Sequence, residues 1–463
     1  MTAAWFDELD RRTRGRLLPP GAAGFEDALR LYTASLPGRP AAVLRARSAA
    51  DVAAAVTTAA AAGVPLSVRG GGHSGAGFAV APGGLMLDLG SLRGVRVTAE
   101  RATERATARA EPGATWGDYD TATQQHGLAS TGGIVSTTGV AGLTLGGGIG
   151  ALRGLHGLAV DNLRAADVVL ADGSLVRADA TTEPDLFWAL RGGGGNFGVV
   201  VAFHFDLHPV TQLVTGLLAW PLDRAQEAVA AYRSRAGELP DDVVAEFVFG
   251  HSRAGDPVVM LTPRAAGGPA SAEPLLSTMR AVGSPEDSVT ARSYVAGQCF
   301  MDAMAGWGSR HYWHTTTLRH LGEDVVAVLA EFAAEAPSHR SAVIVEHLHG
   351  AVSRRDAAET AVGFRHAPYN VFVEAKWDAP ADDAVNRDWA RRLIRALEPF
   401  GAGGAYVNYL PRDATAEQIR DAYGAERFAR LRRIKAAYDP GNLFRTNQNI
   451  PPAGGGQERR DRS

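Results

Sequence analysis

The sequence predicts an α+β protein with more than one domain, and three features of the chain predict this class. Strands, helices and glycine-rich loops alternate through residues 1–209. Between about 210 and 412 the glycine triplets disappear, and strands alternate with amphipathic helices instead. With 463 residues, of which 46% are hydrophobic, the chain is also long enough to form more than one core.

The elements follow from local patterns. An apolar strand at 42–46 precedes an alanine-rich helix, which begins at Ser48 with Asp51 three residues later and ends at Gly63. A second strand, 64–68, then enters a glycine-rich loop. The other expected elements are a strand at 84–90, a helix at 115–126 closed by Gly127, a hairpin at 168–177 turned at Asp172-Gly173, helices at 223–235 and 384–397, and a strand at 371–377.

The loop after the second strand reads Arg69-Gly70-Gly71-Gly72-His73-Ser74-Gly75. Consecutive glycines can adopt the positive φ angles that point successive backbone N–H groups inward, so such a loop can bind phosphate oxygens without a lysine. His73 at its rim would then face whatever the phosphates carry. The alternative interpretation of this loop, taken alone, is a surface turn with an incidental histidine.

Three more blocks follow this loop. They are a glycine-rich segment from Gly132 to Gly150, a segment from Pro184 to Val200 with four consecutive glycines, and Tyr406-Val407-Asn408-Tyr409 followed by 438–445. In this order the four blocks resemble the berberine bridge enzyme-like branch of the vanillyl-alcohol oxidase and p-cresol methylhydroxylase (PCMH) superfamily, from about residue 40 to 450.

That resemblance implies a domain plan. It places an FAD-binding domain with two subdomains at 1–209, whose PCMH-type part spans about 36–212. A substrate domain with an antiparallel sheet flanked by helices would occupy 210–412. Residues 413–450 would return to the FAD domain, and the polar, glycine-rich tail at 451–463 is expected to be disordered.

The resemblance also implies that FAD is bonded covalently through its 8α-methyl carbon to His73. Many family members add a second bond from a cysteine two residues after the glycine that matches Gly133, but Val135 stands here. Cys299, the only cysteine of the chain, lies far from this motif and is expected to be a small buried hydrophobe. We therefore expect a single histidyl bond and no cysteinyl bond.

Further residues of the same blocks are expected to bind FAD. They are Arg69, Gly70, Gly71, Gly72, Ser74, Gly75, Gly133, Val135, Ser136, Thr138, Gly139, Gly142, Gly146, Gly147, Gly148, Gly150, Val200, Asn408 and Asn442.

The chemistry requires a base near the flavin. The resemblance points to Tyr409 as this base. The alternative interpretation is that Tyr409 only packs in the interface. Because a tyrosine has an ordinary pKa of about 10, it needs a nearby cation or hydrogen-bond donor to act at neutral pH, and Lys376, His366 and Tyr406 are the candidates. If 406–409 is a strand, Tyr406 and Tyr409 point to opposite faces.

Glu374 is a second candidate base, since a glutamate of this sheet serves as the base in berberine bridge enzyme. Glu374 and Lys376 share a strand face, and their alternative interpretation is a solvated salt bridge. His156 is expected to contact the substrate. His204 and His208 are expected to be structural, and no cluster shows the spacing of metal ligands.

The resemblance implies an FAD-dependent oxidase that oxidises an alcohol, amine or phenolic natural product, or a carbohydrate lactol, with dioxygen as acceptor, in bacterial secondary metabolism. A flavin dehydrogenase with another acceptor and a redox-neutral cyclase or scaffold are the alternatives. A Rossmann domain is disfavoured, because no clear buried strand precedes the glycines at Gly146.

The composition excludes other classes. With a net charge of −3, the chain lacks the strongly basic character that is typical of nucleic-acid-binding proteins. No stretch approaches the about 20 apolar residues of a membrane span. The N-terminus carries acids where an export signal needs basic residues, and a single cysteine suits a reducing cytoplasm. We expect a cytoplasmic monomer or homodimer.

Overall fold

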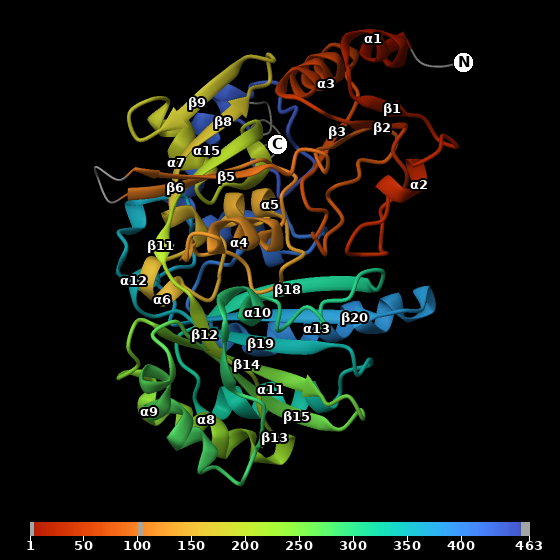
Figure 1. The fold of residues 1–463 in the computed structure, drawn as a ribbon. Coiled ribbons are helices and arrows are strands. Elements are labelled where there is room, and N and C mark those ends of the chain that lie inside the picture. The colour runs from red at the N-terminus through yellow and green to blue at the C-terminus, as the bar shows by residue number, and fades with distance from the viewer. Residues whose placement is uncertain (1–3, 101–104, 455–463) are drawn as a thin grey trace.

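The computed structural model describes residues 4–100 and 105–454 of the chain. Two small sheets with their helices form one part of the molecule, and a single large antiparallel sheet forms the other (Figure 1). Residues 455–463 of the tail lie outside the described residues. The tail's first residues are held, because the backbone N–H of Ala453 donates to the carbonyl of Arg432 at 2.9 Å.

The first small sheet has the strand order β1-β2-β4-β3. Its strands are β1 (Arg16–Leu18), β2 (Ala42–Arg45), β3 (Leu66–Arg69) and β4 (Leu85–Asp88). β4 runs parallel to β2 and β3, so the carboxyl ends of β3 and β4 meet at one edge. This geometry delivers the glycine loop that follows Arg69 to the centre of the molecule.

The second small sheet has the order β5-β6-β10-β8-β9 and is antiparallel. Its strands are β5 (Val95–Glu100), β6 (Arg105–Ala110), β8 (Leu163–Val169), β9 (Leu175–Asp179) and β10 (Val199–Asp206), and a separate pair joins β7 (Leu128–Ala129) to β11 (His208–Pro209). The expected hairpin at 168–177 is β8 and β9. The predicted helix at 115–126 is α4, where Thr115 and Asp118 form a capping box.

The large sheet contains the strands between residues 212 and 377 in the order β16-β13-β15-β14-β19-β20-β18, with β12 and β17 beside β15. Their bounds are β12 (Gln212–Thr215), β13 (Leu218–Pro221), β14 (Val243–His251), β15 (Pro257–Ala265), β16 (Glu286–Asp287), β17 (Thr290–Ser293), β18 (Arg310–Leu318), β19 (Ala342–His347) and β20 (Tyr369–Trp377).

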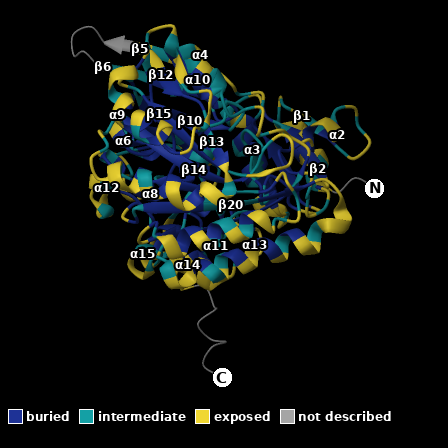
Figure 2. Ribbon diagram, turned by 90° about the horizontal axis from the view of Figure 1, so that it is seen from below, coloured by how far each residue is buried: buried dark blue, intermediate teal, exposed yellow. Residues whose placement is uncertain are grey.

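Helices cover one face of this sheet. They are α8 (Ala225–Ala236), α9 (Pro269–Arg280), α11 (Glu323–Ala334) and α13 (Asp383–Leu397), and their apolar side chains share a core with the sheet. Buried and exposed residues alternate along α11 and α13, as expected for helices that bury one face (Figure 2). The opposite face of the sheet is left to meet the first part of the molecule.

The remaining helices belong mainly to the first part. They are α1 (Ala4–Arg12), α2 (Phe25–Ala28), α3 (Ala49–Ala62), α4 (Trp116–Gln124), α5 (Val140–Gly146), α6 (Arg153–His156), α7 (Pro184–Leu190), α10 (Tyr294–Gln298), α12 (Ala351–Arg354), α14 (Ala416–Tyr423) and α15 (Ala425–Tyr438). Buried Lys435 of α15 donates to the Asn196 carbonyl at 2.6 Å, so the end of the chain packs beside β10.

The sequence predicts one segment wrongly. Residues Val407–Tyr409 form a 3₁₀ turn, not a strand, and the Tyr406 and Tyr409 rings lie 4.6 Å apart. The two-residue alternation of a strand therefore does not apply, and both rings line the same cavity.

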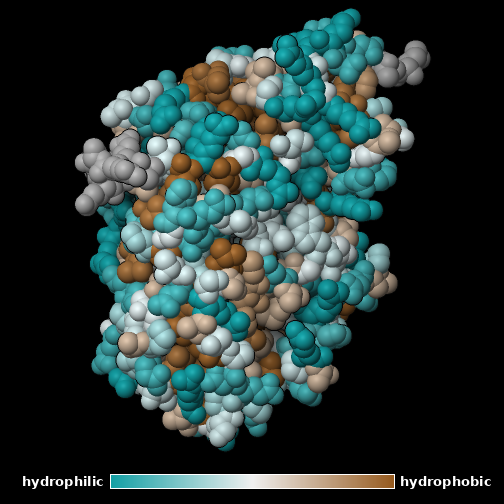
Figure 3. Space-filling model, viewed as in Figure 1, coloured by the Kyte–Doolittle hydropathy of each residue, from teal (hydrophilic) through white to brown (hydrophobic). Residues whose placement is uncertain are grey.

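The visible surface is mainly hydrophilic, with hydrophobic residues in small groups (Figure 3). Among the described residues, no helix has both the length and the apolar character needed to cross a membrane.

Candidate functional site

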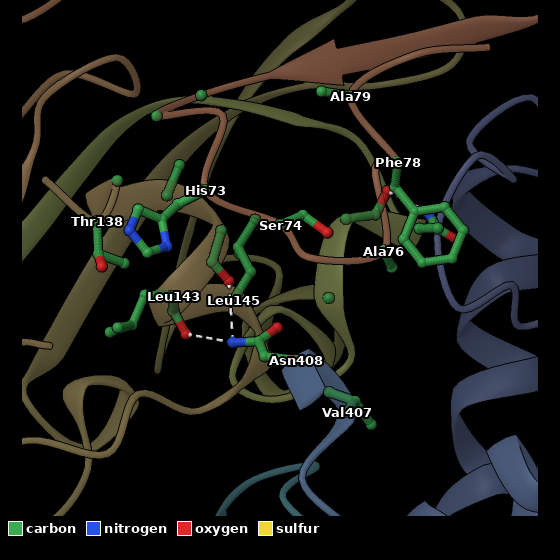
Figure 4. Close-up of a pocket in the computed structure, with 18 of the residues that line it drawn as sticks. His73, Ser74, Ala76, Phe78, Ala79, Thr138, Leu143, Leu145, Val407 and Asn408 are labelled. Atoms are coloured by element: carbon green, nitrogen blue, oxygen red, sulfur yellow. Dashed lines mark hydrogen bonds between the residues drawn. The ribbon is translucent and has the colours of Figure 1, made fainter. Parts of the chain in front are cut away.

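A cavity of about 400 Å³ lies between the glycine-rich loops and the uncovered face of the large sheet. Its volume falls in the range of about 300–1,000 Å³ that is typical of small-molecule sites. One wall is the loop after β3 together with α5, and the other comes from β18, β19 and β20. Figure 4 shows His73 near Thr138, above Asn408, which donates a hydrogen bond to the carbonyl of Leu143.

The glycine loop is held against a second glycine segment because both lack side chains. A Cβ atom on Gly71 would overlap the backbone of Gly139, and Gly72 has a φ of +73°. The carbonyl of Gly72 accepts a hydrogen bond from the Tyr32 N–H at 3.0 Å. Only glycine permits this crossing, which shapes the floor of the cavity.

We expect Gly71→Ala to separate the two loops, because the new methyl group would overlap backbone atoms. Such overpacking costs about 1–3 kcal/mol. The purified variant should melt at a lower temperature and carry less flavin than the wild type. Gly237→Ala is the matched control, since nothing lies within 4 Å of its Cβ position and its φ is −77°. Equal melting temperatures for the two variants would contradict this account.

His73 lies half-buried at the rim of the cavity. Its ring stacks on Tyr32 with centroids 3.9 Å apart, and the Tyr32 ring stacks on His311 at 4.4 Å. The His73 Nε2 atom is buried and has no hydrogen-bond partner. Burial lowers the pKa of His73 to about 4, so the imidazole is neutral at pH 7. A neutral imidazole has a free lone pair, which is the form that can attack a carbon.

The structure brings many of the sequence-predicted residues to this cavity. Those that line it are Arg69, Gly70, Gly71, Gly72, His73, Ser74, Val135, Thr138, Gly139, Gly142, Val200, Glu374, Tyr406, Asn408 and Tyr409.

Other predicted residues lie behind the cavity wall and shape it through packing. Gly75 packs beneath the Trp313 ring, Ser136 donates to Asp302, Gly146 meets Asn408 and Gly147 meets Tyr406, while Gly133, Gly148 and Gly150 pack against Leu143, Ala159 and Gly132.

Three predicted site residues lie away from the cavity. Asn442 occupies a separate concave surface beside Tyr438. His156 stacks on His208 with ring centroids 3.6 Å apart, so the structure gives no support for a substrate contact. Lys376 is buried, and its Nζ donates to the Met304 carbonyl at 2.9 Å.

Glu374 does not form a solvated salt bridge with Lys376, so that alternative is wrong. Its Oε1 accepts from the Tyr32 hydroxyl at 3.2 Å and lies 3.3 Å from His311 Nδ1. Burial raises the pKa of Glu374, but His311, Lys376 and Tyr32 together hold it below its usual value. Glu374 is therefore an ionised group that anchors the stack of rings beside His73.

Tyr409 has a partner that the sequence analysis missed. Its hydroxyl donates to Glu346 Oε1 at 3.2 Å, and its ring stacks on Phe372 at 4.0 Å. Burial and the Glu346 carboxylate raise the pKa of Tyr409 well above 10. None of the expected activators, Lys376, His366 and Tyr406, forms a described hydrogen bond with its hydroxyl.

Tyr406 has a structural place in the wall. Its hydroxyl accepts hydrogen bonds from the Gly148 N–H at 3.0 Å and from Asn408 Nδ2 at 2.9 Å. These contacts tie the 3₁₀ turn to α5 and to the glycine segment after it. Tyr406 thereby supports the position of Tyr409.

Sequence reasoning also missed Tyr32 and Trp313, and nothing in their local sequence distinguishes them from core aromatics. Glu346 carried a signal, since it directly follows the apolar run from Val343 to Val345. A charged residue inside an apolar strand calls for a partner. Its partners are Asn370 of β20 and Tyr409, and their distance along the sequence hides these contacts from local sequence patterns.

Comparison with known proteins places the cavity in context. The family described as FAD binding domain matches residues 40–179, and the family described as berberine and berberine like matches 405–451. (R)-6-hydroxynicotine oxidase of Paenarthrobacter nicotinovorans is 30% identical over 95% of this chain and 97% of its own. Xylooligosaccharide oxidase of Thermothelomyces thermophilus is 30% identical over 90% and 88%.

Solved structures agree with these relatives. The crystal structure of 6-hydroxy-D-nicotine oxidase from Arthrobacter nicotinovorans superimposes with a TM-score of 0.85 at 28% identity, covering 95% of this chain and 98% of that one. Xylooligosaccharide oxidase from Myceliophthora thermophila in complex with xylobiose gives a TM-score of 0.84 at 26% identity, covering 97% and 100%.

Proposed function

Since this chain belongs to the berberine bridge enzyme-like family of FAD-linked oxidases, we propose that it is an oxidase whose FAD is bonded to His73 alone. The observation that carries the proposal is the neutral His73, whose buried Nε2 atom has no hydrogen-bond partner, at the rim of the glycine-walled cavity. Val135 lines the cavity where a cysteine would stand, and Cys299 does not line it.

The residues present fit the cofactor. The crossing of Gly71 and Gly139 leaves backbone without side chains along one wall, where a pyrophosphate needs close approach. Near the sheet, Trp313, Ile344 and Phe372 offer the apolar surface that a ring system needs. We assign Gly70 to Ser74, Thr138 and Asn408 to the FAD site. When bound, FAD accepts a hydride from the substrate carbon and passes the electrons to an acceptor, which we propose is dioxygen.

The cavity favours an apolar or aromatic amine among the candidate substrates. Arg69, Glu346 and Glu374 are the charged side chains that line it in the described part of the chain, and both carboxylates lie on the sheet side. The neighbouring surface includes Met301 and Met304. A sugar, with a hydroxyl on nearly every carbon, would leave polar groups unpaired here, which costs free energy.

In this proposal Tyr409 takes the proton from the substrate nitrogen or oxygen. Its position in the cavity wall and its stacking on Phe372 give the hydroxyl a defined direction. Glu374 holds Tyr32 against the His73 ring and keeps negative charge near a cationic substrate. The apolar wall excludes water from the reacting atoms.

The attachment is tested by acid precipitation of the purified protein, followed by a spectrum and peptide masses of the pellet. We expect a yellow pellet with the FAD mass on the peptide that contains His73 and none on the Cys299 peptide. FAD in the supernatant would refute the covalent bond. Absence of flavin from the protein would refute the oxidase itself.

The substrate class is tested by mixing the enzyme anaerobically with a probe and following the flavin absorbance. We expect 6-hydroxynicotine, as a probe aromatic amine, to bleach the flavin faster than xylobiose does. Hydrogen peroxide should then appear in air. Faster bleaching by xylobiose would overturn the amine assignment, and bleaching without peroxide in air would indicate a dehydrogenase.

A further inference from the structure

The chain between α10 and β18 crosses the edge of the cavity. Its two ends are held in place, because buried Gln298 donates to the Gly133 carbonyl at 2.9 Å and the carbonyl of buried Ser309 accepts from the Ala34 N–H at 2.7 Å. The residues between these ends that line the cavity are Met301, Met304 and Ala305. Residues 299–308 therefore form a piece of the cavity wall that spans two fixed points.

This segment is packed more loosely than the strands beside it. None of residues 299–308 belongs to a hydrophobic core within the described part of the chain. Met304 and Trp307 are 45% and 40% exposed, although both side chains are large and apolar. Moving a segment with so few buried contacts costs less free energy than unfolding a core strand, so this part of the wall can open by itself.

Polar contacts hold the segment against the first part of the molecule. The Asp302 carboxylate accepts from the Ser136 N–H at 2.8 Å and from the Ser136 hydroxyl at 2.6 Å. Trp307 Nε1 donates to Thr137 Oγ1 at 3.4 Å, and the Trp307 ring meets the His73 ring edge-on with centroids 6.0 Å apart. These contacts place the segment directly beside the residue proposed to carry FAD.

Lys376 holds the segment from the side of the large sheet. The side chain is buried, and the Met304 carbonyl at 2.9 Å is the one acceptor described for its Nζ. An ammonium group that is removed from water needs a hydrogen-bond acceptor. If the segment moved away, Lys376 would lose this acceptor, so the contact favours the closed position.

The strand that carries Lys376 also sets the distance between this segment and Tyr409. Phe372, Glu374 and Lys376 occupy alternate positions of β20 and share a face, and the Tyr409 ring stacks on Phe372. With a rise of about 3.3 Å per residue, Lys376 lies about 13 Å from Phe372 along the strand. The segment that Lys376 holds therefore bounds the cavity at a limited distance from Tyr409.

We propose that residues 299–308 form a lid over the cavity and that Lys376 is the positioning residue that holds the lid closed through the Met304 carbonyl. In the closed position, Met301 and Met304 limit how far a substrate extends from Tyr409. The lid thereby selects compact aromatic amines over amines that carry a long alkyl chain. This selection rests on the proposed function, whereas the lid itself does not.

The first test uses Cys299, the only cysteine of the chain, as a reporter at the base of the lid. Its thiol is half-buried, and burial and the Asp302 carboxylate raise its pKa, so N-ethylmaleimide should label the closed holoenzyme slowly. Lys376→Met should speed labelling by about 10-fold or more, the factor expected for loss of a hydrogen bond to a charged group. Trp307→Ala should also speed it, while Val385→Ala, at an exposed apolar residue of α13, should keep the wild-type rate. An unchanged rate in Lys376→Met would overturn the role of Lys376, and unchanged rates in both lid variants would overturn the lid.

The second test separates opening of the lid from general loss of stability. Hydrogen exchange of the holoenzyme, read by peptide mass, should be faster in Lys376→Met across residues 299–308 and should stay at the wild-type level in β18 and β20. Equally faster exchange throughout β18 and β20 would show that Lys376 only stabilises the sheet, and it would overturn the proposed role. Trp307→Ala changes an exposed side chain, so the lid is tested even if Lys376→Met does not fold.

The third test measures the limit on substrate length. The probes are 6-hydroxynicotine and its N-octyl analogue, in which an octyl chain replaces the N-methyl group, and the readout is the rate of anaerobic flavin bleaching. We expect the wild type to prefer the shorter probe and Trp307→Ala to reduce this preference by about 10-fold. An unchanged preference would overturn the length limit. If neither probe reduces the wild-type flavin, the amine assignment of the proposed function fails, while the labelling of Cys299 still decides on the lid.

Discussion

Replacing His73 with alanine should abolish acid-stable flavin attachment and leave a fraction of noncovalently bound FAD. The imidazole is the group proposed to form the bond, whereas the glycine crossing that would receive the pyrophosphate remains intact. The measurement is the absorbance of the pellet and the supernatant after acid precipitation, with the total flavin content of each preparation.

Tyr32→Phe is the control for this prediction. It keeps the ring that stacks on His73 at 3.9 Å but removes the hydrogen bond to Glu374. We expect the covalent bond to persist in this variant. If His73→Ala retained the flavin in its pellet, another residue would have to form the bond, and our assignment would be wrong.

Tyr409→Phe should slow flavin reduction by about 10²-fold or more, with a much smaller change in substrate affinity. The hydroxyl is the only part removed, so the stacking on Phe372 and the packing against Tyr406 remain. Stopped-flow absorbance under anaerobic conditions measures the rate and the dissociation constant separately.

Tyr406→Phe is the matched control on the same turn. Its hydroxyl accepts from Gly148 and Asn408 rather than donating to a carboxylate, so we expect a smaller loss of rate. Tyr409→Phe with an unchanged reduction rate would remove Tyr409 from the reaction and leave Glu374 as the remaining candidate base.

Local patterns were reliable wherever neighbours in sequence determine the structure. Ser48 accepts from the Asp51 N–H and Gly63 has a φ of 62°, so the caps of α3 lie where the sequence predicts them. The run of glycines after Arg69 likewise predicts a loop that admits a close backbone approach. These features depend on residues within a few positions of each other.

Predictions failed where the neighbour comes from a distant part of the chain. Lys376 shares a face of β20 with Glu374, as the sequence predicts, but it does not form the alternative salt bridge, because its Nζ donates to the Met304 carbonyl. The 406–409 segment was expected to be a strand, but its hydrogen bonds go to α5 and the glycine segment.

The sequence by itself determined the family and the absence of a cysteine at Val135, and it predicted that the His73 loop binds FAD and that Tyr409 belongs to the site. Only the tertiary structure decided that Glu346 stands opposite Glu246, that two arginines neutralise Glu246 and that Tyr409 donates to Glu346. The physical reason is that protonation depends on burial and on charges a few ångströms away, and these charges come from separate strands and from a turn far along the chain.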